Sequence, residues 1–507
     1  MSAPESHHDV VVVGSGSGGC VVARRLVDAG LRVLLLEAGG ADASPAIHNP
    51  RRSHELWGAM EDWDYESVPQ AACGGRVLHW PRGRVRGGSS ALNGMIYARG
   101  ARADYDHWAY LGNAGWGWDD VLPYFKRSED FDRGADAFHG AGGPLHVTTK
   151  YEPHPLHQAI VGAAQEAGLA FNADYNGERQ DGVSYMQFTI RDGERLNAAR
   201  AFLDPLGESP LLRVALGARA RRLLFEGERC VGVEYEQDGA PRRARAEREV
   251  VLSAGVVGSP QLLMLSGVGP AEHLRALGID VRADLPGVGE NLQDHVVCPL
   301  IFAAPRAIPD RAEGLPEMQS HLFWRSRSGL PAPDVQPIHF TTPRYEPWMS
   351  GPREGYTLHA GMIRPASRGT VRLASADPAA APLVDPGYLS AEIDLDTVVA
   401  SLELNREIAA QPALREWTER ELYPGADVRG AMLRDYVRSA LGTYHHQVGT
   451  CRMGVDAGAV VDPALRVRGV EGLRIADASA MPVVPSGNTH APTVMIGERA
   501  AELVLAG

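Results

Sequence analysis

The sequence predicts a mixed α/β (α+β) protein in which a Rossmann-like, dinucleotide-binding domain is joined to a second domain with an antiparallel sheet. Three observations predict this fold class. An apolar run at 10–13 leads directly into a GxGxxG motif and a helical pattern. The run REVVLSA at 248–254 is again followed by a glycine-containing turn and a helix, which indicates that the same sheet is resumed. From about 296 to 440, prolines and aromatic residues increase and short strand-like runs appear.

The first strand, glycine loop and helix have the order of a dinucleotide-binding unit. Gly14 allows the tight turn, Gly16 lets the backbone approach a pyrophosphate, and Gly19 lets helix and strand pack closely. The helix expected over 20–29 offers free N–H groups and a partial positive charge to the phosphates. These residues leave open whether the dinucleotide is NAD or FAD. The alternative interpretation is a glycine-rich turn in some other α/β protein.

A second apolar strand over 32–36 ends at Glu37. In dinucleotide-binding units an acidic side chain about 20 residues after the first glycine accepts a hydrogen bond from a ribose 2′-OH. A carboxylate at that place repels a 2′-phosphate. Glu37 therefore argues against NADP.

Composition argues against several classes of function. The 507 residues are too many for one ordinary domain. The net charge of −13 argues against nucleic acid and an anionic membrane surface as partners. The five cysteines are widely spaced without a CxxC, which favours reduced thiols, a cytoplasmic protein and no metal site. The polar N-terminus lacks a basic n-region, and no segment approaches the ~20 apolar residues that span a bilayer.

A stretch dense in glycine and arginine at 74–100 contains the small residues GGSS at 87–90 before an apolar run. Such residues can form a pocket that a flat ligand enters, and the alternative is a solvated loop. Further elements follow in order: helices over 103–130 and 156–167, strands over 211–236, strands over 335–341 and 357–363, helices over 391–410 and 429–440, a strand and turn over 472–482, and a helix over 493–505.

Seven stretches together resemble the glucose–methanol–choline (GMC) family of flavin oxidoreductases. They are VVVGSGSGGCVVARRL with LLLEAGG, GRVRGGSSALNGMIYARG, FHGAGGPL, SAGVVGSPQLLMLSGVG, LPGVGENLQDH, YHHQVGTCRMG and LRIADASAMPVVPSGNTHAPTVMIGERAA. They come in the family order and extend over essentially the whole chain. The resemblance implies that the dinucleotide is FAD. Members with covalent flavin often carry a histidine before the loop asparagine, where this chain has Leu92, so we expect non-covalent FAD.

We therefore expect an FAD-binding domain in three parts and a substrate-binding domain in two. The FAD-binding parts are residues 1–150, 196–295 and 441–507, and the substrate-binding parts are 151–195 and 296–440. The resemblance implies these cofactor contacts: Gly14, Gly16 and Gly19 at the pyrophosphate, Glu37 at the adenosine ribose, Val85, Gly88, Asn93, Gly94 and Met95 along the isoalloxazine, Ala220 at the adenine, and Asp477 and Ala478 at the ribityl and phosphate region.

The resemblance also implies oxidation of a primary alcohol to an aldehyde, with hydride transfer to flavin N5 and proton abstraction by a base. Histidine suits the base because its unperturbed pKa is near neutrality. In YHHQVGT (444–450) the family register places His446 at the first active-site position and turns His445 away. His490 falls where members carry His or Asn. We expect His446 to be the general base and His490 to orient the alkoxide, although these roles could be exchanged.

Two residues depart from the family pattern. Arg86 replaces an aliphatic residue, and we expect it either to alter the edge of the flavin site or to point to solvent. Gln447 replaces a proline, which we expect to loosen that turn. We expect Trp63 and Ile96 to line the substrate pocket near the flavin.

The expected partners are a small-molecule alcohol and O₂ or a quinone-type electron acceptor, for a monomer or homodimer. The alternatives are a same-fold flavoenzyme with lyase or decarboxylase chemistry, or a non-catalytic flavoprotein. The presence of both histidines argues against these alternatives.

Overall fold

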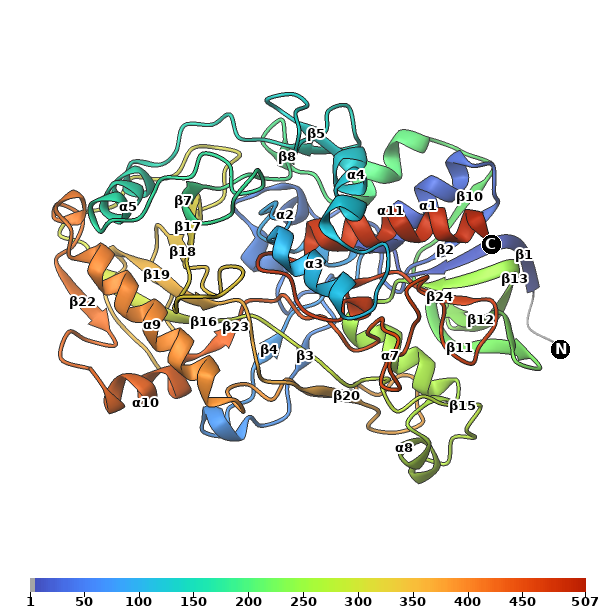
Figure 1. Ribbon diagram of the computed structural model, residues 1–507. Helices are drawn as coiled ribbons and strands as arrows, with labels where there is room; N and C mark the ends of the chain where they lie inside the picture. The colour runs from blue at the N-terminus through green and yellow to red at the C-terminus, as the bar shows by residue number, and fades with distance from the viewer. Residues whose placement is uncertain (1–4) are drawn as a thin grey trace.

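The computed structural model describes residues 5–507 and contains two large sheets, at the right and the left of Figure 1. The first is seven-stranded with the order β10-β2-β1-β13-β12-β11, and β24 also pairs with β13. Its strands are β1 (Glu5–Val13), β2 (Val33–Leu36), β10 (Leu212–Ala215), β11 (Arg219–Glu226), β12 (Arg229–Gln237), β13 (Ala240–Leu252) and β24 (Leu473–Ile475). All pairs are parallel except β11–β12 and β12–β13.

The centre of the first sheet is apolar because helices cover it. Residues 10–13 of β1 and all of β2 are buried, as expected for parallel strands covered on both faces. Helices α1 (Ser17–Asp28) and α11 (His490–Ala506) lie side by side (Figure 1). A Cβ at Gly497 of α11 would lie 2.8 Å from the carbonyl oxygen of Gly18 in α1. The two ends of the chain therefore pack together beside one sheet.

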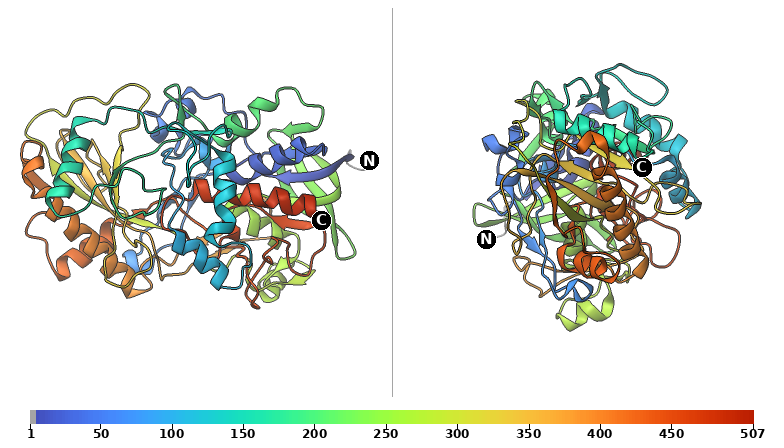
Figure 2. Two further views of the ribbon diagram at one scale, coloured as in Figure 1. Left: turned by 45° about the horizontal axis from the view of Figure 1, so that its top comes forward. Right: turned by 90° about the vertical axis from the view of Figure 1, so that its left-hand side faces the viewer.

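The second sheet is also seven-stranded, and all its pairs are antiparallel. Its order is β22-β16-β19-β18-β17-β7, with β23 also paired to β16. Its strands are β7 (Gly182–Tyr185), β16 (Val296–Ala303), β17 (Ser320–Phe323), β18 (Ile338–Phe340), β19 (Gly355–Met362), β22 (Arg420–Tyr423) and β23 (Gly442–Thr443). Helices α5 (Pro155–Glu166), α9 (Glu392–Ala409) and α10 (Ala431–Ala440) pack around it (Figure 2).

Shorter elements connect the two parts. The remaining helices are α2 (Pro45–His48), α3 (Arg102–Tyr110), α4 (Trp118–Ser128), α6 (Ala198–Phe202), α7 (Gly255–Leu265) and α8 (Ala271–Ala276). The remaining strand pairs are β3 (Tyr65–Glu66) with β4 (His79–Trp80), β5 (Glu129–Phe131) with β6 (Leu145–Val147), β8 (Ile190–Arg191) with β9 (Glu194–Arg195), β14 (Val268–Gly269) with β15 (Ala283–Asp284), and β20 (Thr370–Arg372) with β21 (Leu383–Asp385).

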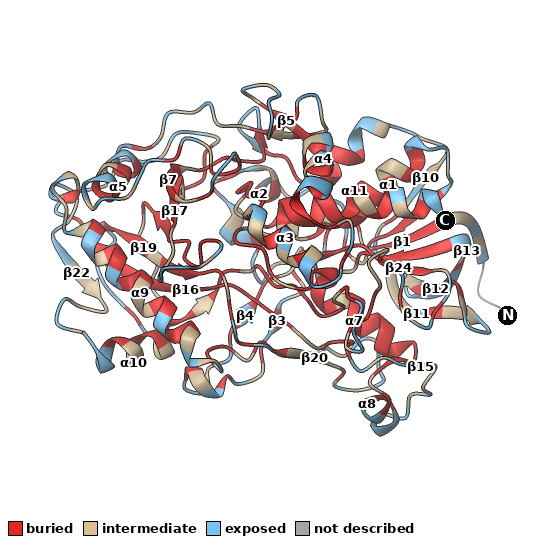
Figure 3. Ribbon diagram, viewed as in Figure 1, coloured by how far each residue is buried: buried red, intermediate tan, exposed pale blue. Residues whose placement is uncertain are grey.

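Each large sheet has its own buried core, visible as red ribbon in Figure 3. All five cysteines are buried free thiols. Among residues 5–507, no helix has both the length and the apolar composition needed to cross a membrane.

The predicted fold class is confirmed: one sheet is mainly parallel and the other antiparallel. Residues 248–252 form the end of β13, which pairs with β1 as expected for a resumed sheet. The predicted helices over 391–410 and 429–440 correspond to α9 and α10. The C-terminal helix begins at His490, three residues before the predicted start, and this difference affects the site described next. The domain boundaries stay a prediction.

Candidate active site

A cavity of about 1330 Å³ is lined by residues of both large sheets and of the loops that join them. One end, the nucleotide end, is formed by the loops after β1 and β2 and by the start of α7. The other end, the substrate end, includes Val297 of β16, Ile338 and Phe340 of β18 and His359 of β19. The loops at 444–447 and 488–489 line the same cavity.

The glycine turn after β1 is too crowded for any side chain. Gly14 has φ +99°, and a Cβ there would collide with the backbone of Ser253. Gly14 and Gly16 line the cavity, together with Ser17 at the N-terminus of α1. Gly19 does not line the cavity: its missing side chain leaves room for the carbonyl of Gly14. The structure therefore shows the packing role expected for Gly19, and its contact with the pyrophosphate stays a prediction.

Glu37 lies at the end of β2, is almost fully buried and lines the cavity. Its carboxylate accepts hydrogen bonds from the backbone N–H and hydroxyl of Ser15, at 3.0 and 2.7 Å, and from the N–H of Gly39 at 2.8 Å. Burial raises the pKa of Glu37, and these hydrogen bonds oppose the rise. A crowded glycine turn, a helix N-terminus facing the cavity and a buried acid fit the ADP half of a dinucleotide.

The glycine-rich loop passes directly over the first glycine turn. A Cβ at Gly88, where φ is +54°, would lie 2.7 Å from Cα of Gly16. Gly88, Asn93, Gly94 and Met95 all line the cavity. The backbone contact leaves space for a flat ligand along this loop.

Val85 does not lie along this wall, which corrects the expectation for it. The side chain is buried in a small apolar cluster with Ile47 and Leu92, and the residue does not line the cavity. The loop turns sharply at Gly87, where φ is +96°. Residues before and after that turn therefore face different surroundings.

Arg195 orders the same loop, and sequence reasoning missed it. The guanidinium is buried and donates to the backbone oxygen and the side-chain oxygen of Asn93, both at 2.6 Å, and to the carbonyl of Ile47 at 2.7 Å. Burial lowers the pKa of Arg195 to about 9. Nothing in the local sequence marks this arginine as different from the many at the surface.

Asp477, Ala478 and Ala220 complete the nucleotide end, and all three line the cavity. The carboxylate of Asp477 accepts hydrogen bonds from the N–H of Gly255 at 2.9 Å and from the hydroxyl of Ser259 at 2.6 Å. Asp477 thereby joins the turn after β24 to the N-terminus of α7. Burial raises its pKa.

Arg86 neither borders the cavity nor points freely to solvent. Its guanidinium forms ion pairs with Asp42, at 3.1 Å, and with Asp204. These ion pairs contradict the solvent alternative, while an effect of Arg86 on the edge of the flavin site stays a prediction.

His446 is the centre of a buried hydrogen-bonded chain. Its Nδ1 lies 3.0 Å from Nδ1 of His295, and its Nε2 lies 2.9 Å from the amide nitrogen of Asn488. The ring of Tyr444 stacks on the imidazole with centroids 4.6 Å apart. Burial, followed by the neighbouring His295 and Arg82, holds the pKa of His446 well below its usual value. His446 is therefore neutral at pH 7.

Gln336, which lies two residues before β18, sets the direction of this chain of hydrogen bonds. Its amide nitrogen lies 3.2 Å from the side-chain oxygen of Asn488 and 3.2 Å from Nδ1 of His321. Because Gln336 donates to the oxygen of Asn488, the nitrogen of Asn488 faces His446. Nε2 of His446 must then carry the lone pair, while Nδ1 carries the proton and donates to His295.

Asp294 supports the same loop and was not singled out from the sequence. One carboxylate oxygen accepts from the backbone N–H of His446 at 2.9 Å. The other accepts from Tyr388 at 2.5 Å, Thr443 at 2.6 Å and Gln447 at 3.2 Å. Burial raises the pKa of Asp294 to about 6. The amide of Gln447 thus bonds to Asp294 and Thr443, which makes it part of the loop's hydrogen-bonding network rather than a source of looseness.

His490 does not contact His446, which corrects the expected histidine pair. As the first residue of α11, it places Nδ1 2.8 Å from the hydroxyl of Ser17 in the nucleotide loop. Among residues 5–507 its Nε2 has no hydrogen-bond partner, and burial lowers its pKa to about 4. The residue beside His446 is Asn488, two positions earlier. His445 also lines the cavity instead of turning away, with its ring 4.9 Å from that of Trp57.

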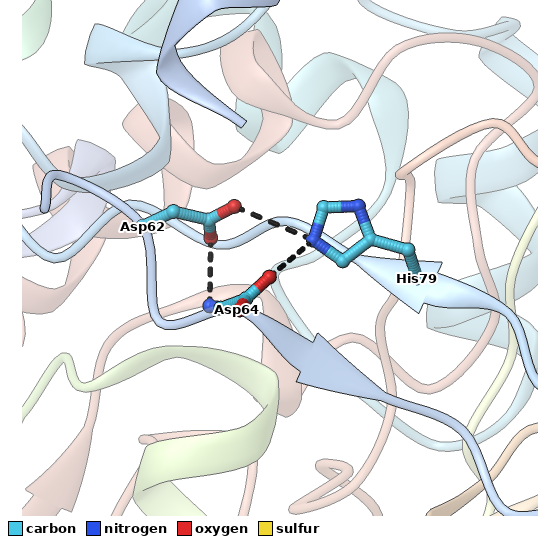
Figure 4. Close-up of side chains that lie close together, drawn as sticks. All are labelled: Asp62, Asp64 and His79. Carbon is cyan, nitrogen blue, oxygen red and sulfur yellow. Dashed lines mark hydrogen bonds and ion pairs between the residues drawn. The ribbon is translucent and has the colours of Figure 1, made fainter. Parts of the chain in front are cut away.

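Asp62, Asp64 and His79 lie close together near β3 and β4 (Figure 4). Nε2 of His79 is 2.8 Å from Asp64 and 3.6 Å from Asp62. The carboxylate of Asp62 already accepts three backbone N–H bonds, from Gly58, Asp64 and Arg82. Its oxygens thus hold the surrounding loops together.

The fold and the cavity define a dinucleotide-dependent oxidoreductase whose cofactor site is built mainly by the parallel sheet. The sequence model of the GMC oxidoreductase family matches residues 8–297 with its N-terminal part and 365–497 with its C-terminal part. The chain belongs to the GMC oxidoreductase family. It is an FAD-dependent alcohol dehydrogenase or oxidase.

Named relatives match over the whole length. Choline dehydrogenase of Mus musculus mitochondria is 43% identical, over 99% of this chain and 90% of the relative. Oxygen-dependent choline dehydrogenase of Brucella ovis is 39% identical, over 98% and 95%. Among solved structures, pyridoxine 4-oxidase from Mesorbium loti has a TM-score of 0.94 and 36% identity, covering 97% of this chain and 98% of that one.

Proposed function

We propose that this protein oxidises a primary alcohol to an aldehyde, with His446 as the general base and Asn488 as the hydrogen-bond donor to the alcohol oxygen. The observation that carries the proposal is the 2.9 Å approach of the amide nitrogen of Asn488 to Nε2 of His446 in a cavity that also holds the cofactor loops. An alcohol oxygen that lies beside both nitrogens and replaces the hydrogen bond between them can donate its proton to Nε2 of His446 and accept a hydrogen bond from Asn488.

The surrounding residues prepare His446 for this role. Gln336 orients the amide of Asn488, so that Nε2 keeps its lone pair. His295 accepts a hydrogen bond from the Nδ1–H of His446. Burial lowers the pKa of His295 to about 3, which keeps His295 a neutral acceptor. The ionised carboxylate of Asp294 holds the loop of His446 in place by accepting the backbone N–H of His446. This resembles the way in which a buried acid supports a catalytic histidine in other enzymes.

FAD, when bound, supplies the hydride acceptor at N5. We propose that Gly14, Gly16, Ser17 and the N-terminus of α1 hold its phosphates and that Glu37 receives the ribose hydroxyl. Gly88, Asn93, Gly94 and Met95 are proposed to line the isoalloxazine, with Asp477 and Ala478 at the ribityl chain and Ala220 at the adenine. Leu92 offers no nucleophile next to Asn93, which supports non-covalent binding. His490 is assigned to the cofactor side, through its bond to Ser17.

The proposal is tested by mixing the purified yellow holoenzyme anaerobically with a panel of primary alcohols and then admitting air. We expect one class of alcohol to bleach the flavin. Fast return of the colour with peroxide identifies O₂ as acceptor, and slow return with fast oxidation by a soluble quinone identifies a dehydrogenase. A flavin that no alcohol in the panel reduces, although dithionite does, would contradict the proposal.

A further inference from the structure

The cavity contains an arginine pair at its substrate end, far along the chain from the proposed base. Arg311 and Arg344 both line the cavity that His446 lines. The guanidinium carbon of Arg344 lies 4.9 Å from the ring centroid of Phe340, and its charge is paired with Glu317. Nη2 of Arg311 donates to the backbone carbonyl of Arg51 at 3.3 Å. Within residues 5–507, no carboxylate lies within ion-pair distance of Arg311.

The acidic residues of the substrate end are already neutralised. Glu317 is paired with Arg344 and also accepts a hydrogen bond from Thr342 at 2.8 Å. Glu346 is paired with Arg76 at 3.2 Å. The part of the chain that the structure describes thus offers no unpaired carboxylate there to a cationic ligand.

Aromatic rings could bind a cation instead, but arginines already cover two of those that line the cavity. Arg344 lies over Phe340, and Trp63 has Arg219 at 5.4 Å and Arg84 at 5.6 Å from its ring centroid. At those two rings a quaternary ammonium group would meet like charge. Trp57, Tyr65, Tyr345, Trp348 and Tyr444 also line the cavity. The contrast with the chain as a whole, whose net charge is −13, indicates that this positive region is a local feature of the cavity.

We propose that the alcohol substrate carries an anionic group, a carboxylate in the simplest case, which binds Arg311 and Arg344 while the hydroxyl meets His446 and Asn488. This inference rests on the proposed function and names its substrate class. A guanidinium presents paired N–H donors that match a carboxylate, and one unpaired arginine beside a paired one leaves a net positive charge for it. Burial lowers the pKa of Arg344 to about 10, with Arg311 adding to the effect, and an anion between the two would relieve that repulsion.

Part of the wall at the substrate end is apolar. Val297, Ile338 and Phe340 line it, and Tyr444 stacks on His446. The substrate therefore has an apolar segment between its hydroxyl and its anionic group. Choline, for which several relatives are named, has a cation in place of the anion and is a poor match to this cavity.

The test uses holoenzyme and three benzyl alcohols that differ only in the para group: carboxylate, methyl and trimethylammonium. The rate of anaerobic flavin reduction divided by the dissociation constant is measured for each by stopped flow. We expect the carboxylate to exceed the methyl compound by about tenfold or more, since hydrogen bonds between charged groups are among the strong ones, and the trimethylammonium compound to be the poorest.

Arg311→Gln and Arg344→Gln should each lower the ratio of the carboxylate value to the methyl value to near one. A flavin content and a melting temperature close to those of wild type show that each variant is folded. Arg306→Gln is the matched control, because Arg306 is exposed and paired with Glu416. An unaltered carboxylate preference in both cavity variants would overturn the proposal.

Two ligands without a hydroxymethyl group separate this inference from the function on which it rests. Binding of 4-methylbenzoate and of (4-methylphenyl)trimethylammonium is measured from the change in the flavin spectrum. Tighter binding of the benzoate supports the anion site, and equal or tighter binding of the cation overturns it, whether or not any alcohol reduces the flavin. Flavin reduction by neutral or cationic alcohols alone would leave the proposed function standing and overturn the anion site.

Discussion

Asn488 presents its amide nitrogen to Nε2 of His446 at 2.9 Å, and Gln336 holds the amide oxygen of Asn488 from the other side. This arrangement joins the loop before α11, the loop after β23 and the strand edge at β18. Asn488 and His490 are only two positions apart in the sequence, but they bond to different parts of the site. Asn488 bonds to His446, whereas His490 bonds to Ser17. Substitutions of Asn488 and of His490 should therefore have different effects.

Asn488→Leu removes the donor to the alcohol oxygen. We expect flavin reduction by alcohol to slow by about 10²-fold, the scale on which loss of one such donor acts, with FAD still bound. His490→Gln is the comparison: it should weaken retention of FAD during gel filtration more than it slows reduction. If His490→Gln slows reduction as strongly as Asn488→Leu, the assignment of His490 to the cofactor side is wrong.

Gln336 acts through Asn488 and is a positioning residue. In Gln336→Glu the carboxylate can only accept, so it favours the flipped amide, whose oxygen faces His446 and demands a proton on Nε2. We expect an alcohol to reduce the flavin more slowly in Gln336→Glu than in Gln336→Met. The difference should be greatest at pH 7 and above, where the new carboxylate is ionised. Stopped-flow rates from pH 5 to 9 check this, with exposed Gln158→Met as control. Equal rates of flavin reduction in both Gln336 variants at every pH would argue against the orienting role of Gln336.

The pH dependence of flavin reduction follows from two shifted pKa values. The pKa of His446 is lowered, so the base stays neutral well below the usual value near 6.5. The pKa of Asp294 is raised to about 6, so its carboxylate is ionised above that pH and protonated below it. We therefore expect the rate to be constant above about pH 6.5 and to fall as the pH drops through 6 and below. An acid limb with its midpoint at pH 7 or higher would contradict both assignments.

Gly88→Ala tests the contact between the two glycine loops. The added methyl would lie 2.7 Å from Cα of Gly16, at a residue whose φ is positive, so one loop must move. We expect the purified variant to contain less FAD per chain than wild type, measured from its absorbance spectrum. Gly40→Ala is the control, since nothing lies within 4 Å of its added methyl and its φ is not positive. Full FAD content in Gly88→Ala would show that the loop approach does not shape the cofactor site.

The strand, turn and helix around Gly14 could be predicted from sequence because their constraints are local: a tight turn, a helix start and an acid at the end of the next strand. Loop positions that depend on tertiary contacts could not. Val85 faces a core cluster because the chain reverses at Gly87. Asn488 and His490 are both plausible residue types for the site, and only the start of α11 decides which one faces His446.

Supporting residues gave no local signal at all. Arg195, Asp294 and Gln336 are ordinary polar residues in the sequence, and their importance arises from burial and from partners more than a hundred residues away along the chain. The cofactor loops lie at one end of the sequence and the proposed base at the other. They share a cavity because α11 returns to pack beside α1.

The most direct test of the account is anaerobic stopped-flow reduction of the flavin in His446→Ala with the best alcohol of the panel. Loss of a positioned base slows proton transfer by about 10²–10⁴-fold, and we predict a fall in that range with FAD content equal to that of wild type. His79→Gln is the control, because His79 is another histidine that lines the cavity. Alcohol should reduce the flavin of this variant at the wild-type rate. Near-normal reduction in His446→Ala would contradict the assignment of His446 as the base.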